Sequence, residues 1–291
     1  MAQAALRLPQ NVAGDFFVDS SCIDCDACRQ IAPETFAERY DQSFVHRQPR
    51  TPEHEQRALM ALVACPTASI GTESHRQVAP AVAAFPTPIV DNIYFCGFTS
   101  ESSFGAWSYL IVRPREQGGN VLVDSPRFAA PLVRRIEELG GVSLMFLSHR
   151  DDIADHARFA EHFNCPRLMH AADGAARMGI ERVLQGDAAL TLDGDLTIIP
   201  TPGHTRGHQV LLYKQKALFT GDHLAWSPER KTLIAFRNYC WDSWPLQTRS
   251  MERLLDYRFE WALPGHGRIG HGSKEEMHRQ LQDCVAWMKT V

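Results

Sequence analysis

The stretch TPGHTRGH at residues 201–208 follows an apolar run, LTIIP, and places His204 and His208 in a loop. Two similar stretches follow it, FTGDH at residues 219–223 and LPGHG at residues 263–267. Each comes directly after a strand-like run and enters a loop, which is where an α/β scaffold usually presents functional side chains. The sequence therefore predicts a metal site built from loops that are distant along the chain.

A fourth stretch, SHRDDIADH at residues 148–156, follows the apolar run VSLMFL, which indicates a buried strand. In this order the four stretches resemble the metallo-β-lactamase superfamily over about residues 88–270. The resemblance implies a four-layer αβ/βα sandwich with the metal site at one edge. It also implies that His204 binds a first metal, Asp222 bridges two metals and His266 binds the second.

The stretch at residues 148–156 differs from the superfamily pattern H-x-H-x-D-H. His149 matches the first histidine, Asp151 stands at the second histidine's position, and isoleucine and alanine follow where Asp and His are expected. A helix that begins near Asp152 would place Asp152, Asp155 and His156 on one face, within reach of the site. We therefore predict as metal ligands His149, Asp151, Asp155, His156, His204, Asp222 and His266, and as general base Asp152.

These residues leave the identity and number of the metals open. His149, His204 and Asp222 alone would form a 2-His-1-carboxylate triad, which suits non-haem Fe(II). The persulfide dioxygenases of the same superfamily use the matching three positions for one iron. Alternatively, one or two zinc ions held with the other candidate ligands would activate water for hydrolysis. A further interpretation is a scaffold that has lost its metal.

Three of the eight cysteines lie within seven residues, where Cys22, Cys25 and Cys28 form the pattern C-x2-C-x2-C. A fourth, Cys65, is followed by proline. Three thiolates on one loop and a distant Cys-Pro can bind the four corners of an Fe–S cube. Alanine stands where a two-cluster protein has its next cysteine, so we expect one 4Fe-4S cluster on these four cysteines. A zinc knuckle and a set of buried thiols are the alternatives.

The cysteine pattern resembles the single-cluster 4Fe-4S ferredoxins over about residues 12–75. A proline- and alanine-rich stretch, RQVAPAVAAFPTPIV at residues 76–90, indicates a linker after it. We therefore predict an α+β chain of two domains. A ferredoxin-like domain would occupy residues 1–80, and a metallo-β-lactamase-like αβ/βα sandwich would occupy residues 81–291.

The composition excludes several classes of partner. Of 291 residues, 44% are apolar and 22% are charged, and the net charge is −4, which disfavours nucleic acid. No apolar run approaches the roughly 18 residues needed to cross a bilayer, so no membrane partner is expected. The N-terminus lacks the continuous apolar segment of a secretory signal, which favours a cytoplasmic location. The expected partners are a small-molecule substrate and, through the cluster, a redox protein.

The leading hypothesis is a metal-dependent hydrolase with an attached ferredoxin-like domain and an unknown substrate. An oxidoreductase is the alternative, because a hydrolase has no chemical need for an electron carrier. Its cluster would supply electrons to a non-haem iron site, either persulfide dioxygenase-like or di-iron-like. A non-enzymatic electron-transfer protein on a metal-free scaffold is a third hypothesis. The aromatic segment FRNYCWDSW at residues 236–244 would form either a pocket wall or, as we favour, packing against the next helix.

Overall fold

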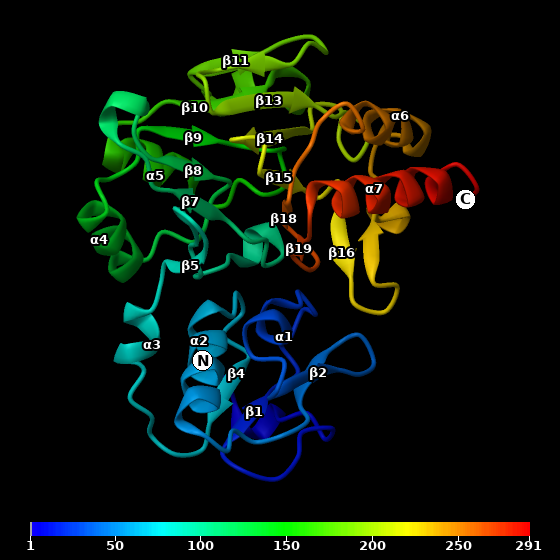
Figure 1. The fold of residues 1–291 in the computed structure, drawn as a ribbon. Helices are drawn as coiled ribbons and strands as arrows, with labels where there is room; N and C mark the ends of the chain where they lie inside the picture. Colours follow the sequence, from blue (N-terminus) through cyan, green and yellow to red (C-terminus); the bar gives the residue numbers. More distant parts are fainter. Residues whose placement is uncertain (1) are drawn as a thin grey trace. The chain divides into compact units, whose positions relative to one another are not determined.

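The structure is a computed structural model that describes residues 2–291 (Figure 1). Contacts between residues divide the chain into two units. The first unit runs to Val112 and includes Ser125–Gly141, and the second comprises Arg113–Asp124 and Val142–Val291. The boundary expected near residue 80 lies inside the first unit, and the division into domains at that residue stays a prediction.

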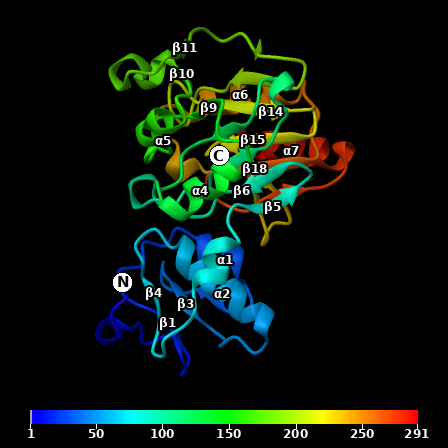
Figure 2. The ribbon, with the colours of Figure 1, turned by 90° about the vertical axis from the view of Figure 1, so that its left-hand side faces the viewer.

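The first unit opens with the cysteine-rich part of the chain. Its strands form two antiparallel pairs, β1 with β4 and β2 with β3, and helix α2 packs against α1 (Figure 2). Strands β5, β6 and β7 follow as an antiparallel ladder. The bounds are η1 Ala4–Leu6, β1 Phe16–Val18, α1 Ala27–Ile31, β2 Phe36–Glu38, β3 Ser43–Val45, α2 Pro52–Ala64, β4 Ile70–Thr72, α3 Ala79–Ala83, β5 Thr87–Val90, β6 Ile93–Phe95, η2 Glu101–Ser103, β7 Tyr109–Ile111 and α4 Ala130–Glu138.

Helix α2 begins where local sequence signals place it. The Thr51 hydroxyl accepts a hydrogen bond from the backbone N–H of His54, so it caps the first turn. Pro52 occupies the first helical position, and Glu53 and Glu55 place negative charge near the positive end of the helix dipole. The helix ends one residue before the fourth clustered cysteine, which it therefore positions.

The second unit contains a parallel ladder in the order β11-β10-β9-β8 and a six-stranded sheet in the order β12-β13-β14-β15-β18-β19. Within residues 2–291, no helix is long and apolar enough to span a membrane. The bounds are η3 Arg115–Gln117, β8 Val121–Val123, β9 Leu144–Phe146, α5 His156–Phe163, β10 Arg167–His170, η4 Ala171–Asp173, η5 Ala175–Met178, β11 Arg182–Leu184, β12 Leu190–Thr191, β13 Leu196–Pro200, β14 Gln209–Tyr213, β15 Ala217–Gly221, β16 Ala225–Ser227, β17 Thr232–Ile234, η6 Arg237–Tyr239, α6 Trp244–Leu254, β18 Trp261–Pro264, β19 Gly270–His271 and α7 Lys274–Met288.

Strand register brings four loops to one edge of the six-stranded sheet. Strand β14 runs antiparallel to β13 and β15, and Pro200 pairs with Gln209. Strand β15 runs parallel to β18, and Gly221 pairs with Pro264, so both strands end at this edge. The backbone N–H of Gln209 donates to the carbonyl of Ser148 at 2.9 Å, which attaches the loop after β9 to the same edge. The histidine- and aspartate-bearing loops therefore meet there.

Two loops of the second unit contain residues at positive φ. Strands β14 and β15 form a hairpin, with Lys214 and Gln215 at positive φ in its turn. The helix expected to begin near Asp152 is wrong in its start, because α5 begins at His156. The preceding segment is irregular, with Ala154 at a φ of 29°. Residues 152, 155 and 156 therefore do not share a helical face.

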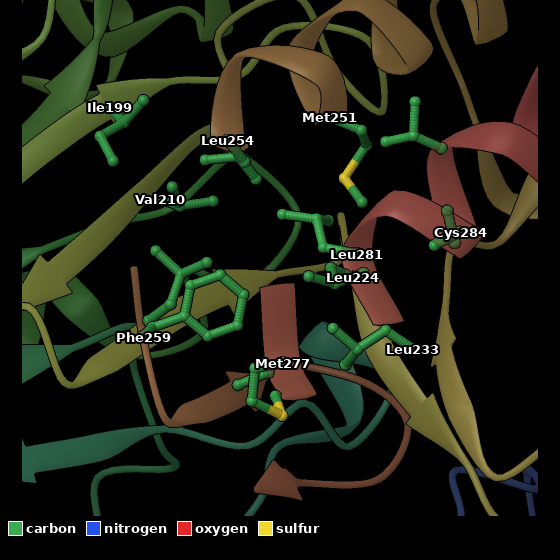
Figure 3. Packing of buried hydrophobic residues seen from close by; sticks show 14 of the residues in the cluster. Ile199, Val210, Leu224, Leu233, Met251, Leu254, Phe259, Met277, Leu281 and Cys284 are labelled. Atoms are coloured by element: carbon green, nitrogen blue, oxygen red, sulfur yellow. The ribbon is translucent and has the colours of Figure 1, made fainter. Parts of the chain in front are cut away.

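A buried apolar cluster joins this sheet to helices α6 and α7 (Figure 3). Strands β13 and β14 contribute Ile199 and Val210, and α7 contributes Met277 and Leu281, all fully buried. Each buried aliphatic or Met side chain stabilises the fold by about 1.5–3 kcal/mol relative to an exposed one. The cluster includes Cys284, which behaves as a small apolar side chain. This core supports the sheet edge that carries the loops.

Candidate metal centre

Two histidines and two carboxylates converge at the sheet edge. The Nε2 atoms of His149 and His204 each lie 3.7 Å from Oδ2 of Asp222 and 3.8 Å from Oδ2 of Asp151. The two imidazole rings meet edge to face at 4.8 Å. The Oγ of Ser148 lies 2.9 Å from Nδ1 of His149, which orients that ring and leaves Nε2 for another partner. The loops after β9, β13 and β15 thus form a first group of metal-type atoms.

A second group shares Asp222 with the first. The Nε2 of His266 lies 3.7 Å from Oδ1 of Asp152 and 3.9 Å from Oδ2 of Asp222. Gly265 permits this approach, because a Cβ there would lie 2.3 Å from Oδ2 of Asp152 and 2.9 Å from Oδ1 of Asp222. The arrangement is that of two neighbouring sites with one shared carboxylate.

The donor atoms fit metal ions. Among residues 2–291, several buried atoms have no hydrogen-bond partner: Nε2 of His149 and His204, both carboxylate oxygens of Asp152, and Oδ1 of Asp222. Leaving such atoms unpaired is costly, so they indicate an additional partner. Two ligands about 2.1 Å from one zinc lie roughly 3.4 Å apart at a tetrahedral angle. The observed separations between Nε2 and Oδ2 atoms, 3.7 and 3.9 Å, are close to that value.

Exposure defines the side from which a substrate would approach. The Asp151 side chain is 43% exposed and that of His266 is 23% exposed. The side chains of Asp152 and His149 are 1% and 0% exposed, so solvent does not reach them. Solvent therefore reaches the centre at Asp151 and His266.

The charges at this centre depend strongly on one another. Burial raises the pKa of Asp152. Burial opposes the ionisation of Asp222 too, but His266 and the other histidines hold its pKa below the usual value. His204 lowers the pKa of Asp151. Burial lowers the pKa of His204, yet the carboxylates around it produce a net rise. The centre therefore attracts cations through its carboxylates.

Two of the predicted ligands, Asp155 and His156, make other contacts in the structure, and their role as ligands stays a prediction. Nδ1 of His156 is 3.1 Å from Nη1 of Arg167, and a carboxylate oxygen of Asp155 is 3.8 Å from Nη1 of Arg158. Within the described chain, neither residue belongs to a cluster of three or more metal-type side chains. The reason is the late start of α5: the irregular turn before it directs Asp152, not Asp155 or His156, toward His266.

Asp152 itself occupies a different place from the one its predicted role requires. A general base needs access to the water that it deprotonates. Asp152 is 1% exposed, and its Oδ1 faces Nε2 of His266 at 3.7 Å, too long for a hydrogen bond. This position matches a ligand of the second group better than it matches a free base.

The structure adds supporting residues that the sequence analysis did not select. Oδ1 of Asp124 accepts the backbone N–H of Ser148 at 2.7 Å, and this fixes the residue before His149. Asp124 follows the apolar strand β8, the same strand-then-aspartate signal that marked the loop after β15. His208 and His223 stack at 4.8 Å behind the centre, and burial lowers the pKa of His223 to about 3. Both rings are therefore neutral and pack against the ligands.

In the first unit, the four clustered cysteines line one small hollow. Cys28 is buried and the other three are half-buried, and the backbone N–H of Ser69 lies 3.3 Å from Sγ of Cys65. Burial raises the pKa of the Cys25 thiol to about 12, with smaller contributions from the neighbouring cysteines. Four closely placed thiolates in such surroundings need a cationic group between them, and an Fe–S cluster supplies one.

A segment distant in sequence covers this hollow. A Cβ on Gly105 would lie 2.6 Å from Cβ and 2.8 Å from Sγ of Cys25, and Gly105 has a φ of 81°. The Thr99 hydroxyl donates to the carbonyl of Ala64 at 2.7 Å, directly before Cys65. The surroundings of the cysteines therefore extend beyond the ferredoxin-like range into residues 99–105.

Comparison with protein families supports a cluster in the first unit. Residues 18–72 match the model described as the 4Fe-4S single cluster domain of ferredoxin I. This range contains all four clustered cysteines. The predicted ferredoxin-like segment is thereby confirmed.

Curated relatives match another part of the chain. The hydroxyacylglutathione hydrolase of Rhodospirillum rubrum is 29% identical over 138 residues, 46% of this chain and 54% of that protein. The hydroxyacylglutathione hydrolase of Citrobacter koseri is 31% identical over 120 residues, 40% of this chain and 47% of that protein. The chain thus spans about half the length of the curated relatives it matches.

Solved structures show the fold. The BLEG-1 B3 metallo-β-lactamase superposes with a TM-score of 0.51 at 17% identity, over 67% of this chain and 99% of that one. The DIM-1 metallo-β-lactamase superposes with a TM-score of 0.53 at 19% identity, over 70% of this chain and 95% of that one. The predicted combination of a ferredoxin-like segment with this fold is confirmed.

Proposed function

Because the chain joins a segment of the single-cluster 4Fe-4S type to the metallo-β-lactamase fold, we propose that it is a metal-dependent hydrolase with a ferredoxin-like domain. Its substrate class would be small thioesters or esters, by likeness to the hydroxyacylglutathione hydrolases. The observation that carries this proposal is the pair of metal-type groups that share Asp222. The identity of the metals, zinc or iron, is part of the same proposal.

Different residues would bind each of the two ions. His149, His204 and Asp151 would hold the first ion, and Asp152 and His266 would hold the second. Asp222 would hold both. When bound, the ions supply a Lewis acid that polarises the carbonyl of the substrate and lowers the pKa of water.

The protein's own groups then control access and orientation. Solvent does not reach Asp152 and His149, so the substrate would approach the centre at Asp151 and His266. Ser148 holds the His149 ring by Nδ1, and Asp124 holds Ser148 by its backbone N–H. This chain of contacts fixes the ligand before substrate binds and reduces the reorganisation that catalysis requires.

Hydrolysis of a hydroxyacylglutathione thioester tests the proposal. We expect the metal-loaded protein to hydrolyse it and the chelator-treated protein to lose the activity. The Asp222→Asn variant should fail to bind either ion, because Asp222 belongs to both groups. Its rate of hydrolysis should fall at least 100-fold. Asp155→Asn is the matched control, because the same change there lies outside the centre. Unchanged hydrolysis by the metal-free protein would refute the proposal.

The four-cysteine hollow favours a second candidate function, an oxidoreductase. His149, His204 and Asp222 present ligand atoms within 4.8 Å of one another, the 2-His-1-carboxylate set of non-haem iron oxygenases. In that case a 4Fe-4S cluster on Cys22, Cys25, Cys28 and Cys65 would pass electrons from a redox partner protein. Oxygen or persulfide consumption that requires a reduced cluster would favour this candidate over the hydrolase.

A further inference from the structure

Two aromatic side chains stand exposed beside the candidate metal centre. Tyr239 and Trp241 are 59% and 58% exposed, and their rings meet edge to face at 6.1 Å. The ring of Trp241 lies 6.3 Å from that of His204. Most large apolar side chains of this unit lie in its core, whereas more than half of each of these two side chains is exposed, so this pair contributes little to packing. Exposed aromatic surface next to a reactive site indicates a place where a ligand is bound.

The backbone that carries the pair is tied to the ligand loop. The N–H of Trp241 donates to the carbonyl of His204 at 2.9 Å, and the N–H of Ser243 donates to the carbonyl of Gly203 at 2.9 Å. The thiol of Cys240 donates to the same Gly203 carbonyl at 3.2 Å. The position of the Trp241 ring is therefore fixed relative to the His204 ring, as a preorganised binding surface requires.

Gly203 makes this attachment possible. A Cβ at Gly203 would lie 2.3 Å from the backbone N and Cα of Gln247 in helix α6, and its φ is 143°. The loop after β13 thus lies directly on the helix that follows the aromatic segment. The metal ligand and the aromatic pair belong to one rigid piece of structure.

The nearby charges indicate what kind of group this surface takes. Arg206, from the loop of His204, is 76% exposed, but its Nε lies 3.1 Å from Oδ1 of Asp242. This pairing offsets the cation next to Trp241, so the surface offers ring faces and edges more than charge. Planar apolar groups match such a surface, because aromatic pairs gain attraction beyond simple burial.

We propose that Tyr239 and Trp241 form an acyl-binding wall that selects substrates with an aromatic ring on the scissile carbonyl. The inference rests on the proposed hydrolase function and adds a substrate class to it. The wall lies on the His204 side of the centre, so the carbonyl would reach the ions while the acyl ring contacts Trp241.

Two thioesters of N-acetylcysteamine, benzoyl and acetyl, test this selectivity. Trp241→Ala should raise KM for the benzoyl thioester about threefold to tenfold, the size expected for one lost aromatic contact. It should leave kcat for the benzoyl thioester, and KM for the acetyl thioester, within twofold, because the contact is equal in the ground and transition states. Trp241→Phe should recover most of the loss. Leu190→Ala, at a 40% exposed position on β12, is the control for removal of surface apolar area.

A binding measurement separates this inference from the hydrolase proposal. Calorimetry with S-benzyl-N-acetylcysteamine, which lacks the scissile carbonyl, reports the wall without turnover. Weaker binding to Trp241→Ala than to the unaltered protein supports the wall even if neither thioester is hydrolysed, a result that contradicts only the hydrolase proposal. Equal affinity for both proteins, or an equal rise in KM for both thioesters, would overturn the wall.

Discussion

Gly265 offers the sharpest test of the second metal group. In Gly265→Ala, the new Cβ would lie 2.3 Å from Oδ2 of Asp152 and 2.9 Å from Oδ1 of Asp222. Ordinary van der Waals contact begins at 3.4 Å, so the two oxygens must move by about 1.1 and 0.5 Å (3.4 − 2.3 and 3.4 − 2.9). Gly265 does not have a positive φ, so an alanine there would cause no backbone strain. Any effect of Gly265→Ala would therefore come from the contacts of the new Cβ with the two carboxylates.

Displacements of this size matter because metal ligands are held within about 0.5 Å of their productive positions. We expect Gly265→Ala to weaken binding of the second ion by about 10- to 100-fold, the usual loss when groups that orient ligands are disturbed. The affinity for the first ion should change less than the affinity for the second, because only Asp222 is common to both groups. Calorimetric titration of the chelator-treated protein with zinc measures the two affinities.

Gly194→Ala is the matched control for this experiment. It makes the same change in the same unit, but nothing lies within 4 Å of the new Cβ and the backbone has no positive φ. Its zinc affinities should equal those of the unaltered protein. If Gly265→Ala also binds two ions with unchanged affinity, the assignment of Asp152 and Asp222 to a shared pair of sites is wrong.

Three further predictions concern the cluster and the fold. Gly105→Ala should lower cluster content and make its visible absorbance more sensitive to oxygen, whereas Gly118→Ala, at a similar φ of 91° but with no contact shorter than 3.7 Å, should leave both unchanged. Cys65→Ser should abolish the absorbance of a 4Fe-4S cluster without removing the metals of the second unit; persistence of the absorbance would show that Cys65 is not a ligand. Arg167 lowers the pKa of Glu181 to about 2 from its usual 4.5 through a hydrogen bond, so the pair stabilises the fold above pH 4.5 and this contribution falls as the pH drops toward 2. Glu181→Gln should accordingly lower Tm at neutral pH, by an amount that shrinks below pH 4.5; a difference independent of pH would contradict the ion pair.

The sequence predicts which loops gather at the candidate metal centre, because each of these loops follows a strand. His204, Asp222 and His266 each come one to four residues after a strand, so the sheet register alone brings them together. His149 follows β9 in the same way. The positions of these loops depend on the order and direction of the strands. Apolar runs in the sequence indicate the strands, and the short motifs mark where each one ends.

The outcome at residues 151–156 depended on a backbone detail that motifs do not record. Whether Asp152 or Asp155 reaches His266 depends on where helix α5 begins, and sequence patterns locate helix boundaries poorly. The structure starts the helix at His156, with Ala154 at positive φ. Because the helix starts about four residues later than predicted, Asp152 faces His266 from the irregular segment before it.

The aromatic segment shows a different limit. From sequence, packing was the favoured role for residues 236–244, and Trp244 does contact Trp287 at 5.9 Å. Tyr239 and Trp241 instead point to solvent, because the backbone of this short segment is bound to the loop of His204. Residue types alone do not distinguish a buried ring from an exposed one on an irregular segment.

We propose that one chain holds an Fe–S cluster on four cysteines and two further metal ions that share Asp222. Anaerobic purification followed by metal and labile-sulfide analysis tests it directly, on the full chain and on Asp222→Ala. We predict about four irons with matching sulfide in both proteins, and two additional metal ions only in the unaltered protein. An unaltered protein with four irons and no additional metal, or an Asp222→Ala variant that keeps both ions, would contradict the claim.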